Sequence, residues 1–179
     1  VMSIKMTLYR TEDNSGFIHA LINAAENGIQ VVCLIELKAR FDEKRNIQWA
    51  RQMEDAGVHV VYGIAGLKTH SKISMVVRKE AKGKLQKYVH IGTGNYNSKT
   101  AKLYTDMGLL TTDERLTLEI NEVFNYLTGT SLMLDYKHLL VSPVNAKSKF
   151  IKLIQDQVKR VKDGKKGFVF GKMNSCLLY

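Results

Sequence analysis

The sequence predicts an α/β fold in which helices flank a mixed sheet. Over the first part of the chain, strand-like apolar segments alternate with amphipathic helical segments in the order β-α-β-α-β. Three strand-like segments then follow without a long helix between them, and residues 82–84 suit a hairpin turn. Apolar residues make up 45% of the 179 residues, which is enough to form a core.

The spacing of apolar residues places the individual elements. Strands are expected at residues 2–9, 29–36, 58–63, 72–79, 84–93 and 104–112, and a last strand at 166–175. Helices are expected at residues 14–28, 41–57 and 145–164, and a further one between Thr111 and Gly129. The final helix and strand have the pattern of another α/β unit that is beginning.

Local signals mark where several helices begin and end. Asn14 or Ser15 can cap the first helix, and Gly28 suits its end because glycine tolerates the left-handed conformation. Thr111, followed three residues later by Glu114, has the spacing of a capping box. The last helix has an apolar stripe that we expect to face inward: Phe150, Ile154, Val158 and Val161.

The charge favours polyanionic partners. Lys and Arg total 27 against 17 Asp and Glu, a net charge of +10, which suits nucleic acid, an anionic membrane or phosphate-rich molecules without choosing among them. Cys33 and Cys176 form no disulfide framework, so a cytoplasmic setting is expected, with peripheral membrane association left open. The longest apolar run, residues 31–37, is too short to span a bilayer.

The stretch "GLKTHSKISMVVRK" places a histidine between two lysines at the start of a strand. Side chains two residues apart on a strand share a face, so His70 and Lys72 should point the same way, and Lys68 could join them. Neighbouring cations favour a neutral, nucleophilic imidazole, and an ammonium can stabilise an oxyanion. The pair suits attack on phosphorus, although so short a pattern more often marks a surface histidine beside solvated lysines.

A second block, "HIGTGNYNS", leaves a strand through His90 into a turn with two glycines. Gly94 lets the backbone approach a ligand closely, and Asn95 and Asn97 add amide groups, so the block suits phosphate binding or a plain tight turn. It lacks the Gly-Lys-Ser/Thr of a phosphate loop and the third glycine of a dinucleotide fingerprint.

Two arginines follow predicted strands at the ends where ligands usually bind in α/β sheets. Arg10 follows the first strand and Arg40 the second, and guanidinium groups suit phosphate oxygens. The scattered Asp and Glu residues predict no metal site built by the protein, so Mg²⁺ would arrive with phosphates.

Taken together, these motifs resemble those of bacterial polyphosphate kinases of the first type. The resemblance is carried, in order along the chain, by "SIKMTLYR", "ELKARFDE" with "RNI" and "WA", "AGVHVVYG", "GLKTHSK", "HIGTGNYN", "TAKLYTDMGLLT", "LLVSPVN" and "GFVFGKMNS". It implies a phospholipase D-like catalytic domain at residues 1–133 and the truncated beginning of a second, similar domain at residues 134–179.

The resemblance also implies a reaction and roles for individual residues. The terminal phosphate of ATP would move reversibly to polyphosphate through a phosphohistidine at His70, with Lys72 completing an H-x-K pair. Tyr104 would contact the nucleotide, and Arg10 and Arg40 would serve a site for Mg²⁺ and phosphate. The expected supporting residues around the phosphates are His90, Gly94, Asn95 and Asn97.

The same resemblance implies partners and a limit. ATP or ADP, polyphosphate, the remaining domains of the parent chain and other copies of the full-length protein are the expected partners, and nucleic acid is not. A second essential histidine would lie beyond Tyr179, so we expect this chain alone to be inactive or nearly so.

Two other functions stay open. A phospholipase D-like phosphodiesterase would use His70 covalently, but the wider superfamily has an acid five positions after the lysine, where this chain has Val77. A basic module that binds polyanions without catalysis is the other, although aromatic residues are not interleaved with the basic ones in a clear stacking platform.

Overall fold

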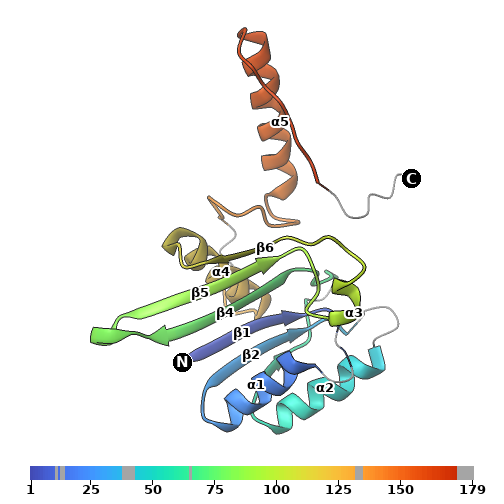
Figure 1. Cartoon of the computed structure of the whole chain (residues 1–179), viewed down its shortest axis with the longest axis vertical. Coiled ribbons are helices and arrows are strands. Elements are labelled where there is room, and N and C mark those ends of the chain that lie inside the picture. Colours follow the sequence, from blue (N-terminus) through green and yellow to red (C-terminus); the bar gives the residue numbers. More distant parts are fainter. Residues whose placement is uncertain (11, 13–14, 38–42, 65, 132–134, 173–179) are drawn as a thin grey trace. The chain divides into compact units, whose positions relative to one another are not determined.

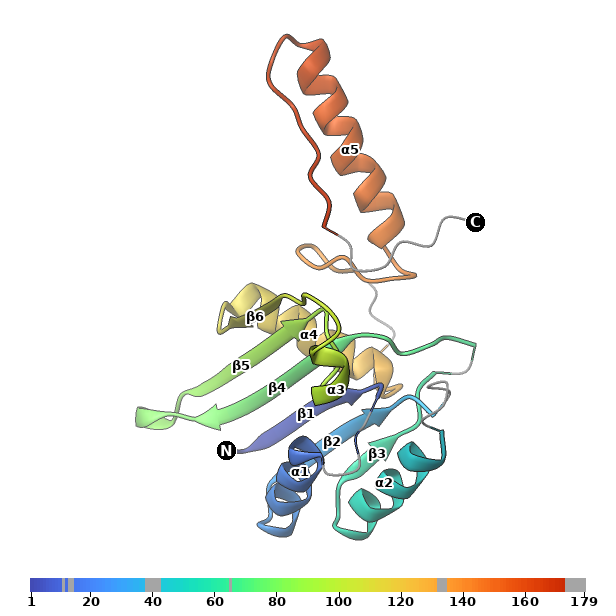
Figure 2. The same cartoon turned by 45° about the vertical axis from the view of Figure 1, so that its right-hand side comes forward.

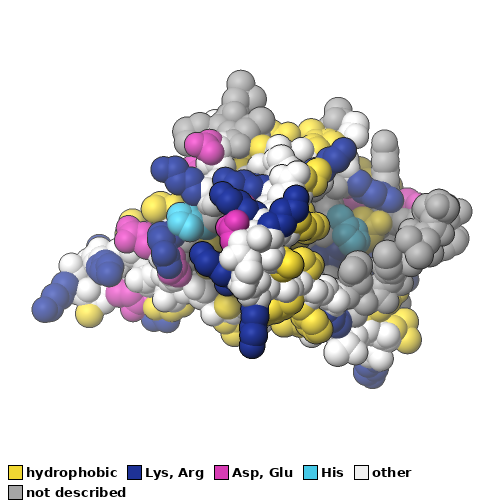
Figure 3. All heavy atoms as spheres, turned by 90° about the horizontal axis from the view of Figure 1, so that it is seen from above, with side chains coloured by type: hydrophobic (Ala, Val, Ile, Leu, Met, Phe, Trp, Pro, Cys, Tyr) yellow, Lys and Arg dark blue, Asp and Glu magenta, His cyan; other side chains and the backbone are white. Residues whose placement is uncertain are grey.

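The computed structural model describes residues 1–179 except 11, 13–14, 38–42, 65, 132–134 and 173–179. The chain divides into two compact units, Val1–Met133 and Leu134–Tyr179. Within the described residues, no helix has both the length and the apolar character needed to cross a membrane. Lys and Arg side chains are spread over the face shown in Figure 3, in keeping with the net charge of +10.

The first unit is built on one six-stranded mixed sheet with the order β3-β2-β1-β4-β5-β6. Its strands are β1 (Ser3–Leu8), β2 (Gln30–Ile35), β3 (His59–Val61), β4 (Lys72–Lys79), β5 (Leu85–Gly92) and β6 (Gly108–Thr111). β1, β2 and β3 are parallel, because helices connect them, whereas β4, β5 and β6 pair antiparallel. The predicted α/β class with a mixed sheet flanked by helices is therefore confirmed.

Helices cover both faces of this sheet. α1 (Gly16–Glu26) and α2 (Glu43–Asp55) pack beside β1, β2 and β3, while α4 (Glu114–Leu127) lies behind β4 and β5 (Figures 1 and 2). The main core lies under α1 and α2 and includes Met6, Ile18, Cys33 and Met53, all at most 3% exposed. Burial raises the pKa of the Cys33 thiol to about 12, so Cys33 is an inert core residue.

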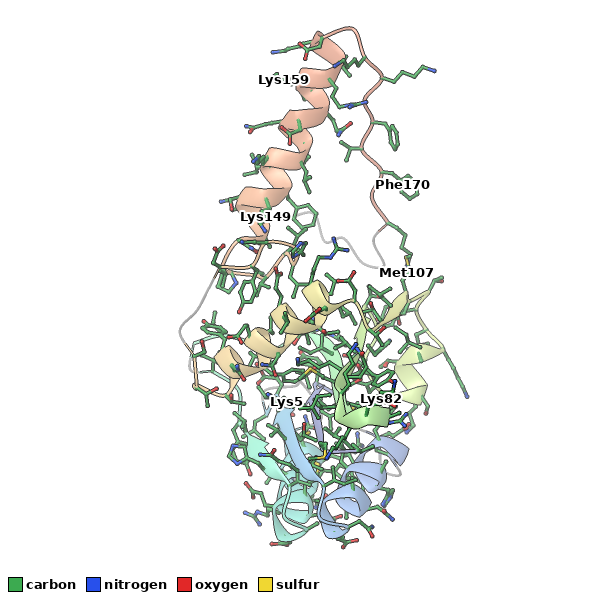
Figure 4. All side chains as sticks on the ribbon, turned by 90° about the vertical axis from the view of Figure 1, so that its left-hand side faces the viewer. Lys5, Lys82, Met107, Lys149, Lys159 and Phe170 are labelled. Atoms are coloured by element: carbon green, nitrogen blue, oxygen red, sulfur yellow. The ribbon has the colours of Figure 1, made fainter. Side chains whose placement is uncertain are left out.

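The opposite face carries a second buried group. Met75 of β4 and Val89 of β5 are buried, as are Ile120 and Phe124 of α4. Lys5, labelled in Figure 4, crosses to this side, and its Nζ donates hydrogen bonds to Asn121 Oδ1 at 3.1 Å and Asn125 Oδ1 at 3.4 Å. Alternation along β1 thus directs Met6 toward α1 and Lys5 toward α4.

The predicted N-cap is correct for α1 and wrong for α4. Ser15 is the N-cap of α1, and its Oγ accepts a hydrogen bond from Ile18 N at 3.4 Å. The capping box at Thr111 is wrong, because Asp113 caps α4 and its Oδ1 accepts from Arg115 N at 2.9 Å. Thr111 Oγ1 instead accepts from Asp113 N, so it stabilises the turn before the cap.

Two short features between β4 and β6 differ in detail from expectation. The hairpin turn is a 3-10 segment, Ala81–Gly83, in which Lys82 adopts φ 62° and Gly83 φ 79°. A four-residue helix, α3 (Ser98–Ala101), precedes β6 and was not predicted. β6 is correspondingly shorter than the expected strand, because residues 104–107 connect α3 to it.

The second unit contains α5 (Ala146–Lys162) and a segment that returns alongside it (Figures 1, 2 and 4). Residues 166–172 are not a strand, and Arg160 Nε donates to Lys166 O; residues 173–175 of the predicted strand lie outside the described part. The prediction that the apolar stripe of α5 faces inward is also wrong. The four side chains of this stripe are 48–57% exposed, although the returning segment approaches Val161 at Gly167: Phe150, Ile154, Val158 and Val161.

Candidate active site

The site begins at the carboxyl end of β1, where the chain turns at Tyr9. Asn46 of α2, 0% exposed, donates from Nδ2 to Tyr9 O at 3.1 Å and to Glu36 O at 2.9 Å. One amide thus ties the ends of β1 and β2 together and sets the backbone of Tyr9. A buried side chain that satisfies two strand-end carbonyls is a strong positional restraint, because an unpaired buried carbonyl is costly.

The segment that carries the histidine is attached to β1 by a buried threonine. Thr7 Oγ1 donates to Ser71 O at 2.8 Å and accepts from Ile73 N at 3.1 Å, on either side of Lys72. Upstream, the buried Glu36 carboxylate accepts from Thr69 N at 2.8 Å. These contacts hold the backbone on both sides of His70, which lies two residues before β4 begins.

His70 lies among three cations that surround the ring of Tyr9. The imidazole and the phenol ring meet edge to face, with centroids 4.6 Å apart and planes at 79°. Lys72 Nζ lies 5.2 Å from the Tyr9 centroid, Arg10 Cζ 5.7 Å and Lys68 Nζ 5.8 Å. Lys72 Nζ also donates to His70 O at 2.5 Å, so the histidine and the lysine converge on one place.

The surroundings lower the pKa of both reactive groups. Burial lowers the pKa of His70 below 6.5, and the positive charges of Lys72, Lys68 and Arg10 lower it further. Burial lowers the pKa of Lys72 to about 8, where Asp106 opposes the shift and Arg10 adds to it. At neutral pH the site therefore holds a neutral imidazole beside charged ammonium and guanidinium groups, which suits an anionic ligand.

The second block packs against the same end of the sheet. His90 lies in a cross-strand row with Ser74 and Met6, and its Nδ1 is 2.7 Å from Tyr96 Oη. The ring occupies space above a pair of facing glycines. A Cβ built on Gly108 would lie 2.7 Å from His90 Nε2, and one on Gly92 2.9 Å from His90 Cε1.

Asp106 connects this block to Lys72. Its Oδ1 accepts from Thr93 Oγ1 at 2.9 Å, and its carboxylate lies against the backbone of Gly94, where a Cβ would meet Oδ2 at 2.3 Å. Gly94 therefore has a steric role, because a side chain at this position would collide with the Asp106 carboxylate. From its place beside Gly94, this carboxylate acts on Lys72.

A cavity of about 350 Å³ lies over the second block. Its lining combines apolar and aromatic groups such as Phe17, Tyr96 and Met107 with the carboxylates of Glu12 and Asp106; of these residues, Figure 4 labels Met107. No Lys or Arg occurs among the described lining residues. The cavity itself is thus less suited to phosphate than the cluster around His70.

The other predicted site residues have varied positions. Asn97 is 8% exposed, and its Oδ1 caps α3 by accepting from Lys99 N and Thr100 N. Asn95 and Gly94 line the cavity, and Asn95 Oδ1 is buried without a hydrogen-bond partner. Tyr104 lies on the segment between α3 and β6 and is 47% exposed. Arg40 lies outside the described residues.

Sequence reasoning missed Tyr9 and Asp106. Tyr9 directly precedes Arg10 at the end of a predicted strand, which was a usable signal, because the residues next to a strand-end arginine share its location. Asp106 gave no signal, since its relation to Lys72 arises only when β4, β5 and β6 pair. Among the described residues, no group of three His, Cys, Asp or Glu could hold a metal ion.

Comparisons with known proteins identify the family of the chain. The family model described as "Polyphosphate kinase C-terminal domain 1" matches residues 1–133. A polyphosphate kinase of Parasynechococcus marenigrum is 59% identical over 99% of this chain, and one of Prochlorococcus marinus is 55% identical over the same share. In both cases the match covers 25% of the relative, so the chain spans about a quarter of the length of these curated relatives.

A solved structure shows the same fold. The crystal structure of polyphosphate kinase from Porphyromonas gingivalis superposes with a TM-score of 0.79 and 34% identity, over 92% of this chain and 27% of that one. The family model covers most of the chain, and the relatives match nearly all of it. The chain therefore belongs to the polyphosphate kinase family, with the family's first C-terminal domain at residues 1–133.

Proposed function

We propose that this chain carries the phosphate-accepting site of a polyphosphate kinase, in which His70 receives the terminal phosphate of ATP and passes it reversibly to polyphosphate. The observation that carries the proposal is the cluster at the end of β1, where the His70 ring and three cations share the surroundings of Tyr9. Membership of the polyphosphate kinase family gives the reaction class.

The chemistry follows from the charge states. The unprotonated ring nitrogen of His70 attacks the terminal phosphorus, the bond to the bridging oxygen breaks, and ADP leaves with that electron pair. A terminal polyphosphate oxygen then attacks the same phosphorus, the N–P bond breaks, and the neutral imidazole is restored. The lowered pKa of His70 keeps the ring unprotonated near neutral pH, which the first step requires.

The cations bind the transferred group. Lys72 is only 5% exposed, and in that partly desolvated position its ammonium neutralises phosphoryl oxygens more effectively than it would in water. Lys68 is exposed and Arg10 is partly buried. The net charge of +10 adds a general attraction for a polyanionic chain.

Mg²⁺ fits this site only as a companion of the phosphates. The groups around His70 are cationic, and cationic groups do not ligate a metal, so the described residues form no cage of their own for it. Bound to ATP, the ion would neutralise phosphate charge. Arg10, with Arg40 by family resemblance, would contact phosphate oxygens of that complex. Other domains of a longer chain would supply the rest of the site.

The test is to incubate the longer protein that contains this chain with γ-labelled ATP and Mg²⁺. We expect an acid-labile, base-stable label on His70, absent in His70→Ala and retained in His59→Ala, a histidine on the edge strand β3. Label on a serine, or none at all, would refute the proposal. Hydrolysis of a bis-phenyl phosphodiester that depends on His70 would instead favour the phosphodiesterase function.

A further inference from the structure

We propose that Tyr9 is the positioning residue of this site: its ring sets the spacing of Lys68, Lys72 and Arg10 around His70 and fixes the orientation of the imidazole. The inference rests on the proposed function, because it assigns a role within the same phosphate-transfer step. It goes beyond the sequence expectations, in which Tyr9 had no part.

The first argument is geometric. One ring makes an edge-to-face contact with the nucleophile at 4.6 Å and lies within 6 Å of three separate cationic groups. The cations come from two places in the chain: Arg10 follows β1, whereas Lys68 precedes β4 and Lys72 is its first residue. The Tyr9 ring lies near both groups, so it couples the histidine segment to the end of β1.

The second argument is electrostatic. Three cations in one place repel one another. Asp106 offsets the repulsion at Lys72, but a carboxylate also repels phosphate. The faces of an aromatic ring attract cations through a quadrupole, without a net charge. The Tyr9 ring therefore attracts the cations without adding a negative charge that would oppose an anionic ligand.

The third argument concerns rigidity. The Tyr9 carbonyl is fixed by Asn46, and β1 is a central strand of the sheet. The neighbouring Thr7 fixes the backbone around Lys72. The ring is therefore presented from a rigid element, which positioning of a nucleophile to within a fraction of an ångström demands.

The experiment compares Tyr9→Leu, Tyr9→Phe and the wild type in the longer protein, by single-turnover labelling from γ-labelled ATP. Tyr9→Leu removes the ring, and we expect the labelling rate of His70 at saturating ATP to fall about 10- to 100-fold. The ATP concentration for half-maximal rate should change by less than about threefold, because the cations remain in the protein. Tyr9→Phe keeps the ring and should restore the rate.

A matched control is Tyr62→Leu, which removes a tyrosine that follows β3 and bonds instead to Glu54 at the surface. It should label His70 at the wild-type rate. If Tyr9→Leu does not fold, Tyr9→Met replaces it with the same expected result.

The outcomes separate the inference from the proposed function. Absence of label on His70 in the wild type overturns the proposed function and, with it, the inference. Label on His70 in the wild type together with an unchanged rate in Tyr9→Leu overturns only the role of Tyr9. A rate in Tyr9→Phe as low as in Tyr9→Leu shows that the hydroxyl, and not the ring, acts, which also refutes the inference.

Discussion

At the scale of single residues, the site depends on a balance between like charges and burial. His70 is pushed toward its neutral form by burial and by three cations, whereas Lys72 is only partly pushed toward neutrality because Asp106 opposes the shift. A neutral imidazole and a charged ammonium can thus coexist two residues apart. The two pKa shifts together define the pH range in which both groups have the form that the proposed phosphoryl transfer needs.

This balance predicts a bell-shaped pH profile for the formation of labelled His70 at low ATP. The pKa of His70 lies below 6.5, so the ring is still unprotonated when the pH has fallen to 6.5. The rate should therefore stay high down to pH 6.5 and decrease only at lower pH, where the ring becomes protonated. Lys72 loses its charge as pH rises through about 8, so the rate should decrease there. Lys72→Arg keeps a charge that does not titrate in this range, and the alkaline decrease should disappear.

The matched control is Lys79→Arg, at the other end of β4, which should keep both limbs of the profile. An alkaline limb near pH 8 that persists in an active Lys72→Arg protein would show that a different group titrates there.

At the scale of elements, the site is made by the ends of strands and by the helix that ties them together. Tyr9 and Arg10 directly follow β1, β4 begins at Lys72, and β5 leads through His90 into the glycine turn. α2 contributes a buried asparagine, which bonds the ends of β1 and β2. The arrangement of these strand ends should therefore depend on α2, although no α2 side chain contacts His70 in the described contacts.

Asn46→Ala tests that dependence. Removal of the amide leaves two strand-end carbonyls without their donor, and the expected loss in the free energy of unfolding is about 1–3 kcal/mol. Urea denaturation followed by circular dichroism measures it. Gln48→Ala, exposed on the same helix, should change the free energy by less than about 0.5 kcal/mol. Equal effects of the two substitutions would mean that the ties to Tyr9 and Glu36 do not matter.

At the scale of the whole molecule, the chain holds one complete sheet domain and a second unit with exposed apolar surface. The described cluster contains one histidine and three cations, and the chain spans about a quarter of the length of its curated relatives. The resemblance described above implies a second essential histidine, which would lie after residue 179. Under the proposed function, the cations gathered here would bind phosphate, but the transfer step would lack a partner group.

We therefore expect the purified 179-residue chain to synthesise polyphosphate at a rate indistinguishable from background, whereas the longer protein is active. A dye-based polyphosphate assay with ATP and Mg²⁺ measures both, and His70→Ala in the longer protein gives the background. Polyphosphate synthesis by the 179-residue chain at a rate comparable to the longer protein would show that residues 1–179 hold the complete site.

Much of the fold was predictable because local patterns and burial agree. The strands at residues 2–9, 29–36 and 72–79 and the helices that became α1 and α2 were placed from apolar spacing, and their boundaries shift by only a few residues. The short α3 was missed because its start depends on the side chain of Asn97, which caps a helix too brief to show periodicity. The cap of α4 was misplaced because Thr111 and Asp113 are both good caps, and only the backbone conformation chooses between them.

The sequence by itself determined the alternation of strands and helices, the excess of positive charge, and the placement of His70 and Lys72 on one side of a strand start, since all three follow from residue type and spacing. The tertiary structure alone decided that Arg10 and Lys68 join them around Tyr9, and that Asp106 acts on Lys72. These relations join residues far apart in the sequence: Arg10 acts on Lys72, 62 positions away, and Asp106 acts on Lys72 from 34 positions away. Strand pairing, and no local pattern, brings such residues together, because hydrogen-bonded registers are satisfied only in the complete sheet.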